Sequence, residues 1–379
     1  APRPQEVALD KLQQQVQQTI DQLVESGTER GVQVAVYRDG AQVVDAVAGV
    51  TDPDSGRPVD AGTVFYNFSI VKGAAATIAH MLAERGLFGY ETPVAELWPE
   101  FAAHGKQAVT VRQVLNHTAG VPAIPLDTTI EDLCDWDKMC AAIADAELWW
   151  EPGTKVGYHA YTFGYIVGEV VRRTTGKRIS QVLREEVAGP LGVADELWFG
   201  MPPAEHHRLA RLEDEPGAAE QAAQMMASLP PDLPMFKSAP PELFPSAEFG
   251  NRPDTLAADI PAGGKTSARA IARMYAALLG EVDGVRLLPR ERLAEATAIS
   301  SSGIDEVFGQ PTTWALGYGV GGPGNDPESA STIFGLGGVG GSFACGDTAT
   351  GSTWAVTKNR ISNDFTTSTQ LGQLIAEAT

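Results

Sequence analysis

The sequence of 379 residues has little cysteine, few basic residues and no long apolar run. Its 3 cysteines are too few for a disulfide framework and lack the spacing of a zinc site. Lysine and arginine total 28 against 48 acidic residues, so the formal charge is −20. Such an acidic surface repels phosphate groups, which argues against nucleic acid and anionic membranes as partners. The absence of a run of about 18 apolar residues predicts no membrane-spanning helix.

The scarcity of cysteine favours a reducing compartment, and we therefore expect a cytoplasmic protein. The sequence begins at Ala1 without a charged segment followed by an apolar one. A secreted protein whose signal peptide has been removed is the alternative. The sequence carries no signature of an oligomeric state.

Hydrophobic patterns near both ends of the chain predict strands beside helices. Apolar residues at spacings of three and four over residues 9–23 predict a helix. Alternation on both sides of an Asp39-Gly40 turn predicts a β-hairpin over residues 32–47. Near the other end, residues 352–357 are typical of a strand and residues 366–377 of an amphipathic helix.

The middle of the chain has mostly helical patterns, clearest at residues 69–85, 161–175 and 266–279. We therefore predict an α+β fold, an α/β sandwich in which helices flank an antiparallel sheet formed from both chain ends. A large, mostly helical region is inserted into this framework. The predicted units are an α/β domain over residues 1–85 and 300–379 and a helical domain over residues 86–299.

The stretch 229–261 contains eight prolines, a density that predicts neither a helix nor a central strand. A loop of this length in a folded domain is usually functional or disordered. Its phenylalanines, Phe236, Phe244 and Phe249, favour an ordered loop that packs over another part of the molecule.

Ser69 and Lys72 form the SxxK spacing of the chain. Residues three apart on a helix share one face, and the apolar neighbours predict that this helix is buried. Burial lowers the pKa of a lysine because it disfavours the charged form, and a neutral amine can take the hydroxyl proton of Ser69. The helix N-terminus also favours a developing oxyanion. The alternative is an N-cap serine beside a lysine that extends to solvent.

A second candidate, Tyr158, follows a Pro-Gly turn and precedes a helical pattern. The positive charge of a nearby lysine lowers the pKa of a phenol, which would let Tyr158 transfer a proton to a leaving group. The alternative is a tyrosine that anchors the turn in the core.

The third candidate is the glycine-rich run at residues 334–342. Glycines on a strand let a substrate approach the backbone closely, and we expect the amides of Val339 and Ser69 to hold an oxyanion together. The alternative is a flexible β-turn. The run also matches the GxGxxG pattern of dinucleotide-binding proteins, but strand-like sequence follows it where that pattern requires a helix. We therefore do not predict a nucleotide site.

In this order, the three motifs resemble those of the penicillin-recognising serine hydrolases. The chain is most similar to the class C β-lactamase-like branch and, within it, to the family VIII carboxylesterases. The resemblance covers about residues 10–375 and includes the segment 109–122, in which His117 is expected to be structural. It implies a β-lactamase/transpeptidase-like fold, a covalent acyl-enzyme and no metal or organic cofactor.

Carried over residue by residue, the resemblance implies that Ser69 is the nucleophile and Lys72 its activating partner. It implies that Tyr158 is the second catalytic base or acid, and that the amides of Ser69 and Val339 form the oxyanion hole. Which of the lysine and the tyrosine is the base stays open, because the two groups titrate as a coupled pair.

Two positions depart from the β-lactamases that the chain resembles. Leu336 stands where they carry a lysine, and Ala160 stands where they carry an asparagine. Both changes remove recognition of a β-lactam and leave the acyl-transfer machinery, so we predict a serine hydrolase of small-molecule carboxylic esters. The residues expected to bind substrate are Leu336, Gly337, Gly338, His159, Trp149 and Trp150, with Phe236 and Phe244 as further wall residues.

Four other functions remain as alternatives. An acyltransferase or an amide-acting relative would use the same acyl-enzyme with a different acceptor or leaving group. A β-lactamase or penicillin-binding protein is less favoured because of Leu336. A binding module that has kept the fold and lost catalysis is disfavoured by the presence of all three motifs.

Overall fold

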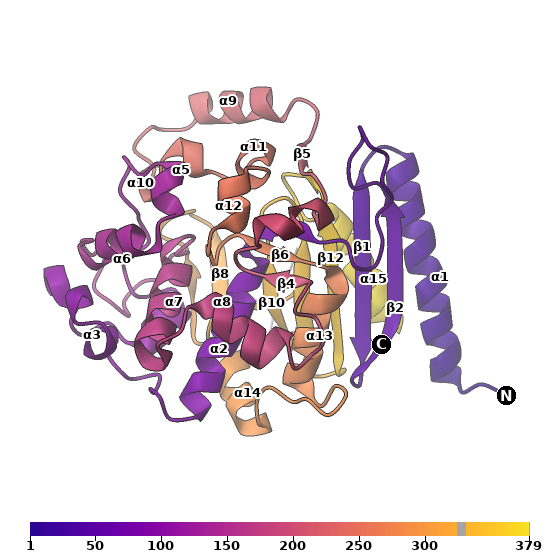
Figure 1. Cartoon of the computed structure of the whole chain (residues 1–379), viewed down its shortest axis with the longest axis horizontal. Helices are drawn as coiled ribbons and strands as arrows, with labels where there is room; N and C mark the ends of the chain where they lie inside the picture. The colour runs from indigo at the N-terminus through magenta and orange to yellow at the C-terminus, as the bar shows by residue number, and fades with distance from the viewer. Residues whose placement is uncertain (324–330, 379) are drawn as a thin grey trace.

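The computed structural model of the chain describes residues 1–323 and 331–378 (Figure 1). Its centre is an 8-stranded antiparallel sheet in the order β2-β1-β12-β11-β10-β9-β8-β7. In that order the strands are Ala41–Gly49, Gly31–Arg38, Ser352–Lys358, Phe343–Asp347, Ile333–Gly337, Gly319–Val320, Pro311–Trp314 and Ser301–Ile304. The first hairpin of the chain pairs with its last long strand, which confirms the predicted α+β fold with a sheet from both chain ends.

The β1–β2 hairpin closes through Asp39 and Gly40, whose φ angles are 49° and 81°. Positive φ at both central residues gives the turn the twist that two antiparallel strands require, and Asp-Gly accepts it at low cost. On its other side β1 pairs with β12, from Val32 opposite Lys358 to Arg38 opposite Ser352. The predicted hairpin is therefore confirmed.

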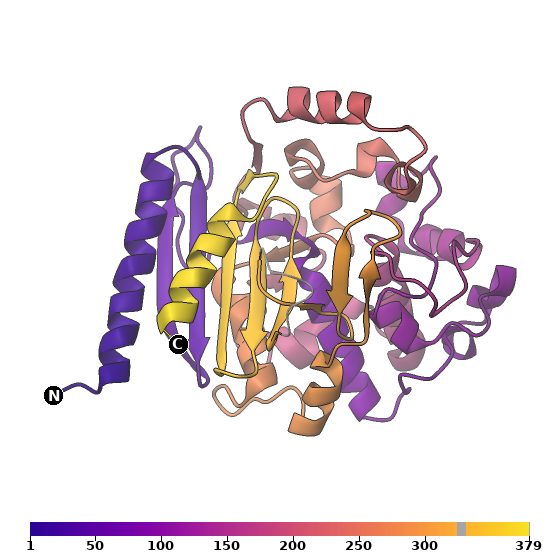
Figure 2. The same ribbon diagram turned by 180° about the vertical axis from the view of Figure 1, so that it is seen from behind.

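Helices cover both faces of the sheet (Figures 1 and 2). α1 (Pro4–Glu25) and α15 (Thr366–Ala378) pack on one face, where Val32, Val34 and Val36 of β1 join their apolar side chains. Because side chains of a strand alternate between faces, Ala35 and Tyr37 belong to the core on the opposite face. α13 (Ala268–Leu279) packs on that opposite face, against β1, β11 and β12.

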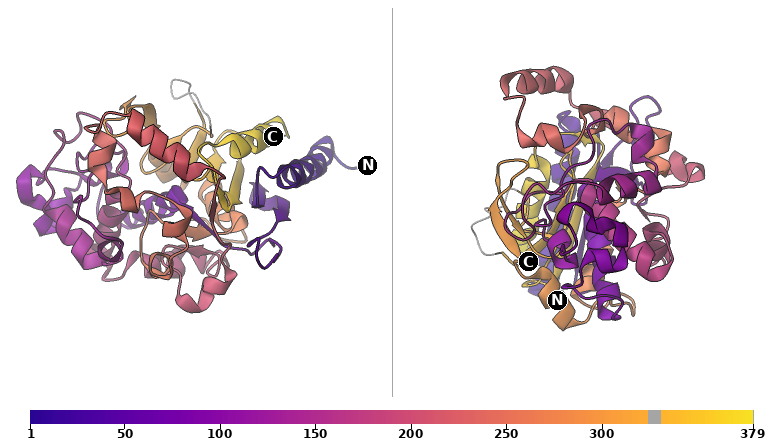
Figure 3. Two further views of the ribbon diagram at one scale, coloured as in Figure 1. Left: turned by 90° about the horizontal axis from the view of Figure 1, so that it is seen from above. Right: turned by 90° about the vertical axis from the view of Figure 1, so that its left-hand side faces the viewer.

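The helical region lies at the opposite side of the molecule from α1 (Figure 3). In chain order it contains η1 (Ser69–Val71), α2 (Lys72–Glu84), α3 (Val94–Leu97), η2 (Pro99–Gly105), α4 (Val111–Leu115), α5 (Ile130–Leu133), α6 (Trp136–Ala144), α7 (Thr162–Thr175), α8 (Ile179–Val182), η3 (Leu183–Ala188), η4 (Pro203–Arg208), α9 (Ala218–Ser228) and α14 (Arg290–Thr297). A small sheet within it has the order β3-β6-β4, with strands Phe65–Phe68, Gly264–Thr266 and Leu197–Trp198, and β5 (Glu213–Asp214) pairs with β13 (Arg360–Ile361). Within residues 1–323 and 331–378, no helix combines the length and apolarity needed to cross a bilayer.

The division into units at residues 85 and 299 stays a prediction. One core of buried side chains joins β1 and β12 of the sheet to α2 and α7 of the helical region. α13 lies within the predicted helical unit, yet it packs mainly against the sheet, with smaller contacts to α14 and η3.

The proline-rich stretch 229–261 is more helical than its sequence predicts. It forms four short helices: α10 (Pro234–Ser238), η5 (Pro241–Leu243), α11 (Ala247–Gly250) and α12 (Pro253–Ala257). The prediction that prolines exclude helix here was wrong, because three of the four helices begin with the proline itself. Proline at the first helical position loses no hydrogen bond and already has a helical φ. Phe249 is buried, as expected of an ordered loop that packs on the molecule.

Candidate active site

A sharp reversal of the chain brings Ser69 to the start of a helix. Phe68, the last residue of β3, has φ 55° and ψ −116°, a conformation that a bulky residue rarely adopts. Strain of this kind costs about 1–3 kcal/mol and persists only where packing enforces it. Phe68 is buried and packs edge-on against Tyr66, with ring centroids 4.6 Å apart. The packing of β3 therefore fixes where the Ser69 side chain begins.

Lys72, the first residue of α2, is fully buried beneath Ser69. Its Nζ donates a hydrogen bond to Ser69 Oγ over 2.8 Å. Burial lowers the pKa of Lys72 to about 7, and no charge on a described group offsets this effect. A substantial fraction of the amine is therefore neutral near neutral pH and can accept a proton.

Tyr158 reaches the same oxygen from the loop before α7. Its hydroxyl donates to Ser69 Oγ over 2.9 Å, and Lys72 Nζ lies 4.9 Å from the centre of its ring. The expected lowering of the phenol pKa by the lysine is not what the structure favours. Burial raises the pKa of Tyr158, and the nearby Asp305 carboxylate raises it further, outweighing the hydrogen bond with Ser69. The phenol is therefore a proton donor at neutral pH.

Two residues that the sequence did not single out hold Tyr158 in place. Asp305 Oδ2 accepts a hydrogen bond from the Tyr158 amide over 2.8 Å, while its Oδ1 accepts from the amides of Val307 and Phe308. The Trp314 ring stacks on the Tyr158 ring, with an interplanar angle of 9°. Both residues are more than 140 positions away in the chain, and no local pattern marks such a contact.

The turn after β10 lies beside the backbone of Asn67 and Ser69. A Cβ atom on Gly338 would lie 2.0 Å from the Asn67 carbonyl oxygen and 3.5 Å from the Ser69 amide nitrogen, so only glycine allows this approach. The next residue is Val339. Among the described residues, neither the Val339 amide nor the Ser69 amide has a backbone acceptor outside the regular helices and strands. Backbone amides beside a nucleophile can stabilise an oxyanion, which is the part that we predict for these two.

A pocket of about 740 Å³ opens above Ser69 and Tyr158. Leu336, Gly337, Gly338 and Val339 line it, as expected from the sequence. Its further apolar wall residues include Phe308, Trp314, Phe343, Ile361 and Phe365. No lysine or arginine is among the described lining residues, and the Asp305 carboxylate is occupied by backbone amides. Asp364 also lines the pocket, and its Oδ1 accepts a hydrogen bond from the Thr366 amide over 3.1 Å. The described lining therefore offers no basic partner to a carboxylate, which favours an uncharged, largely apolar group.

The other expected wall residues lie elsewhere. Trp150 is buried and donates its indole N–H to the Thr118 carbonyl over 3.0 Å, and Trp149 is also outside the described pocket lining. His159 is buried, and its Nε2 accepts from the Val121 amide over 3.1 Å. Trp150 and His159 therefore have structural roles, because their polar atoms are hydrogen-bonded to the backbone.

The two phenylalanines Phe236 and Phe244 are not among the described residues that line the pocket either, and of the proline-rich stretch only Pro245 is. His117 is buried, and its Nδ1 accepts from the His159 amide over 3.0 Å. Its ring also stacks on Phe163 with an interplanar angle of 16°. This environment matches the structural part expected for His117.

The fold and the cluster around Ser69 together define the class of the protein: an antiparallel sheet between helices with the serine, lysine and tyrosine of the penicillin-recognising serine hydrolases. The chain belongs to the β-lactamase family, whose model, described as "Beta-lactamase", matches residues 16–376.

Named relatives agree with this assignment. The chain is 37% identical over 345 residues to the "Esterase/beta-lactamase LipL" of Mycobacterium tuberculosis, covering 87% of this chain and 77% of that protein. The crystal structure of a family VIII carboxylesterase is similar with a TM-score of 0.84 and 31% identity, over 100% of this chain and 98% of that one. A penicillin-binding protein homolog from Caulobacter crescentus has a TM-score of 0.80 and 30% identity over the same shares.

Proposed function

We propose that this protein is a serine hydrolase that cleaves small carboxylic esters through an acyl-enzyme on Ser69. The observation that carries the proposal is the convergence of Lys72 Nζ and Tyr158 OH on Ser69 Oγ, at 2.8 Å and 2.9 Å. Nucleophile and base within hydrogen-bond reach, with a third group oriented toward them, are the general signature of covalent catalysis by a hydroxyl. The esterase names of the similar proteins support an ester as the substrate class.

In the acylation step Ser69 Oγ attacks the ester carbonyl carbon, and its proton passes to neutral Lys72. The carbonyl oxygen becomes an oxyanion that accepts hydrogen bonds from the amides of Ser69 and Val339. Tyr158 gives its phenolic proton to the leaving alcohol, and the proton gained by Lys72 restores the phenol. We assign the base to Lys72 because burial keeps Tyr158 protonated and leaves Lys72 partly neutral.

In the deacylation step a water molecule attacks the acyl carbonyl and gives its proton to the same base. The bond to Ser69 Oγ then breaks, and the proton returns to the serine. The acid product leaves and the starting arrangement is restored. The protonation states of Ser69, Lys72 and Tyr158 at the end of the cycle are those at its start.

The pocket favours an uncharged ester over a β-lactam. Leu336 is part of its wall, where the β-lactamases that the chain resembles carry a lysine. Because no described lining residue is basic, a carboxylate on the substrate would lose its hydration without gaining a partner. The open pocket can also admit an alcohol in place of water. Acyl transfer is therefore the second candidate, measured as the ratio of transfer product to acid product when an alcohol is added.

The decisive experiment compares Ser69→Ala with the wild-type protein on an activated short-chain ester. We expect turnover to fall by at least about 10⁴-fold and labelling by a fluorophosphonate probe to disappear. Intact mass should show the acyl group on wild-type protein only. The matched control is Ser228→Ala on the exposed helix α9, which should change neither. Undiminished turnover in Ser69→Ala would remove the proposed function.

A further inference from the structure

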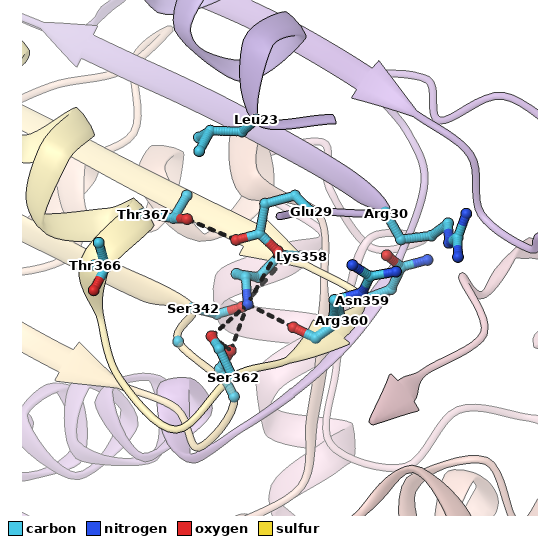
Figure 4. Close-up of polar contacts among 12 residues, drawn as sticks. Leu23, Glu29, Arg30, Ser342, Lys358, Asn359, Arg360, Ser362, Thr366 and Thr367 are labelled. Carbon is cyan, nitrogen blue, oxygen red and sulfur yellow. Dashed lines mark hydrogen bonds and ion pairs between the residues drawn. The ribbon is translucent and has the colours of Figure 1, made fainter. Parts of the chain in front are cut away.

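A second buried lysine, Lys358, contacts Glu29, Ser362 and the carbonyl of Gly340, the residue after Val339 (Figure 4). Lys358, at the end of β12, pairs with Glu29 from the segment between α1 and β1, with Nζ and Oε1 3.2 Å apart. Both side chains are nearly inaccessible to solvent, at 1% and 2%. The other oxygen of Glu29 accepts a hydrogen bond from Thr367 Oγ1 over 2.6 Å.

Lys358 directs its hydrogen bonds at two segments that line the pocket. Its Nζ donates to the Gly340 carbonyl over 2.8 Å, to the Arg360 carbonyl over 2.5 Å and to Ser362 Oγ over 2.7 Å. An ammonium group has three protons, and these three acceptors account for all of them. The pocket lining contains residues 338–341 and 361–365, so one ammonium group ties both segments together from their buried side.

A contribution to folding stability alone does not explain why Glu29 and Lys358 form a buried ion pair. Burial raises the pKa of Glu29 and lowers the pKa of Lys358, which shows that each charge loses hydration. Replacement of a buried ion pair by apolar side chains of similar size is often neutral or stabilising. What apolar side chains cannot supply is three hydrogen bonds in fixed directions to the turn and to its neighbour.

The turn itself needs an external support. Gly340 and Gly341 have φ of 101° and 100°, in a region that glycine enters freely and also leaves freely. The Gly341 carbonyl accepts from Ser368 Oγ over 2.6 Å, and the Gly340 carbonyl accepts from Lys358 and from Ser362. Side chains from β12, from the residue after β13 and from α15 therefore fix the peptide groups that follow Val339.

We propose that the Glu29–Lys358 pair is a positioning device for catalysis, which holds the turn at residues 338–342 so that the Val339 amide meets the developing oxyanion. The proposal rests on the proposed function, because it needs an oxyanion at Ser69. Lys358 supplies the hydrogen bonds, and Glu29 supplies the negative charge that keeps Lys358 an ammonium ion with three donors. Neither residue touches the substrate.

The test replaces both charges together, in Glu29→Leu/Lys358→Met, so that no unpaired charge stays buried. Gly340 keeps the hydrogen bonds from Ser362 in this variant. We expect thermal stability close to that of the wild type, kcat for an activated ester about 10- to 100-fold lower, and KM within about twofold, because loss of one oxyanion donor costs about 10²–10³-fold. Glu29→Gln, which keeps the shape, should show a smaller loss of the same kind and serves if the double variant does not fold.

A second readout separates oxyanion stabilisation from general damage. Sulfur accepts hydrogen bonds weakly, so the thionoester analogue of the same substrate gains little from the amides of Ser69 and Val339. The variants should therefore lose oxoester turnover and keep thionoester turnover, and the ratio of the two rates should fall by the same 10- to 100-fold.

The matched control is Lys106→Met. Lys106 is also fully buried and donates to three carbonyls, those of Ala103, Ala144 and Ala146, in the helical region away from the pocket lining. It should lower stability and leave kcat and the rate ratio unchanged. An unchanged ratio in the Glu29 and Lys358 variants, or an equal change in Lys106→Met, would overturn the proposal. Ser69-dependent turnover of the wild type is measured first, so failure of the proposed function would be seen separately.

Discussion

Two buried lysines in this protein each contact a serine with nearly the same geometry and opposite chemistry. Lys72 Nζ lies 2.8 Å from Ser69 Oγ, and Lys358 Nζ lies 2.7 Å from Ser362 Oγ. Lys358 has Glu29 as a counter-ion and two carbonyl acceptors. Lys72, in contrast, donates to Ser69 Oγ in the described structure. The environment of the amine, and not its distance from a hydroxyl, separates a base from a structural cation.

The partners of each serine complete the difference. Ser362 Oγ donates to the Gly340 carbonyl, so its proton is occupied. Ser69 Oγ faces a pocket and receives hydrogen bonds from Lys72 and Tyr158. Both serines line the pocket, so the two pairs differ in the base and not in access to an electrophile. A nucleophile needs a base with an available lone pair, and of the two lysines Lys72 provides it.

The largest expected effect tests the lysine of the first pair. Lys72→Met removes the base and should lower kcat for an activated ester by about 10³-fold, within the range of general-base catalysis. The protein should become more stable rather than less, since no amine loses hydration on folding. Steady-state kinetics and thermal unfolding measure the two effects. A variant that keeps more than a tenth of the wild-type kcat would show that Lys72 is not the base.

Tyr158→Phe removes the proposed acid and leaves the ring stack on Trp314 intact. We expect kcat to fall by about 10²-fold for an ester of a poor leaving alcohol. The loss should be smaller for an activated ester, because a good leaving group needs no proton. Rates for a series of esters with alcohols of different acidity provide the measurement. Equal losses across the series would assign Tyr158 to another step.

The pH profile tests the protonation states of the first pair. The reactive form of Lys72 is neutral, and its pKa is about 7, so kcat/KM should fall about tenfold for each pH unit below 7. Above pH 7 the profile should be level, because burial moves the pKa of Tyr158 upward.

Lys265 provides the control for that profile. It is also fully buried with a pKa lowered to about 7, but it donates to the carbonyls of Phe199 and Thr255. The decrease in kcat/KM below pH 7 should therefore be unchanged in Lys265→Met. If Lys265→Met loses the decrease in kcat/KM below pH 7, that decrease reports the protonation of Lys265 and not of Lys72.

The smallest effect concerns the support of Tyr158. Asp305→Asn weakens the hydrogen bond from the Tyr158 amide and removes a negative charge near the phenol. We expect a loss in kcat of roughly fivefold, as for one hydrogen bond of modest net strength. KM should stay near its wild-type value. A larger loss in KM than in kcat would show that Asp305 acts on the substrate.

Much of the site could be predicted from short patterns. The SxxK spacing put Ser69 and Lys72 on one turn of a buried helix, and the geometry agrees because helical spacing is local. The glycine-rich run predicted a close approach of the substrate to the backbone, whereas at Gly338 the close neighbour that the structure shows is the Asn67 carbonyl. The positions of Trp149 and Trp150 could not be predicted, because an aromatic pair has the same sequence pattern whether it lines a pocket or packs beneath one.

Chain order and composition by themselves determined the hairpin, the terminal helices and the family motifs, since each depends on residues a few positions apart. Only the tertiary structure decided that Asp305 and Trp314 hold Tyr158, that Glu29 meets Lys358, and that Lys72 has no counter-ion within residues 1–323 and 331–378. These contacts join segments that are far apart in the sequence, and they form only when the strands from both chain ends pair in one sheet. The pKa values of the buried groups then depend on which charges share the same low-dielectric interior.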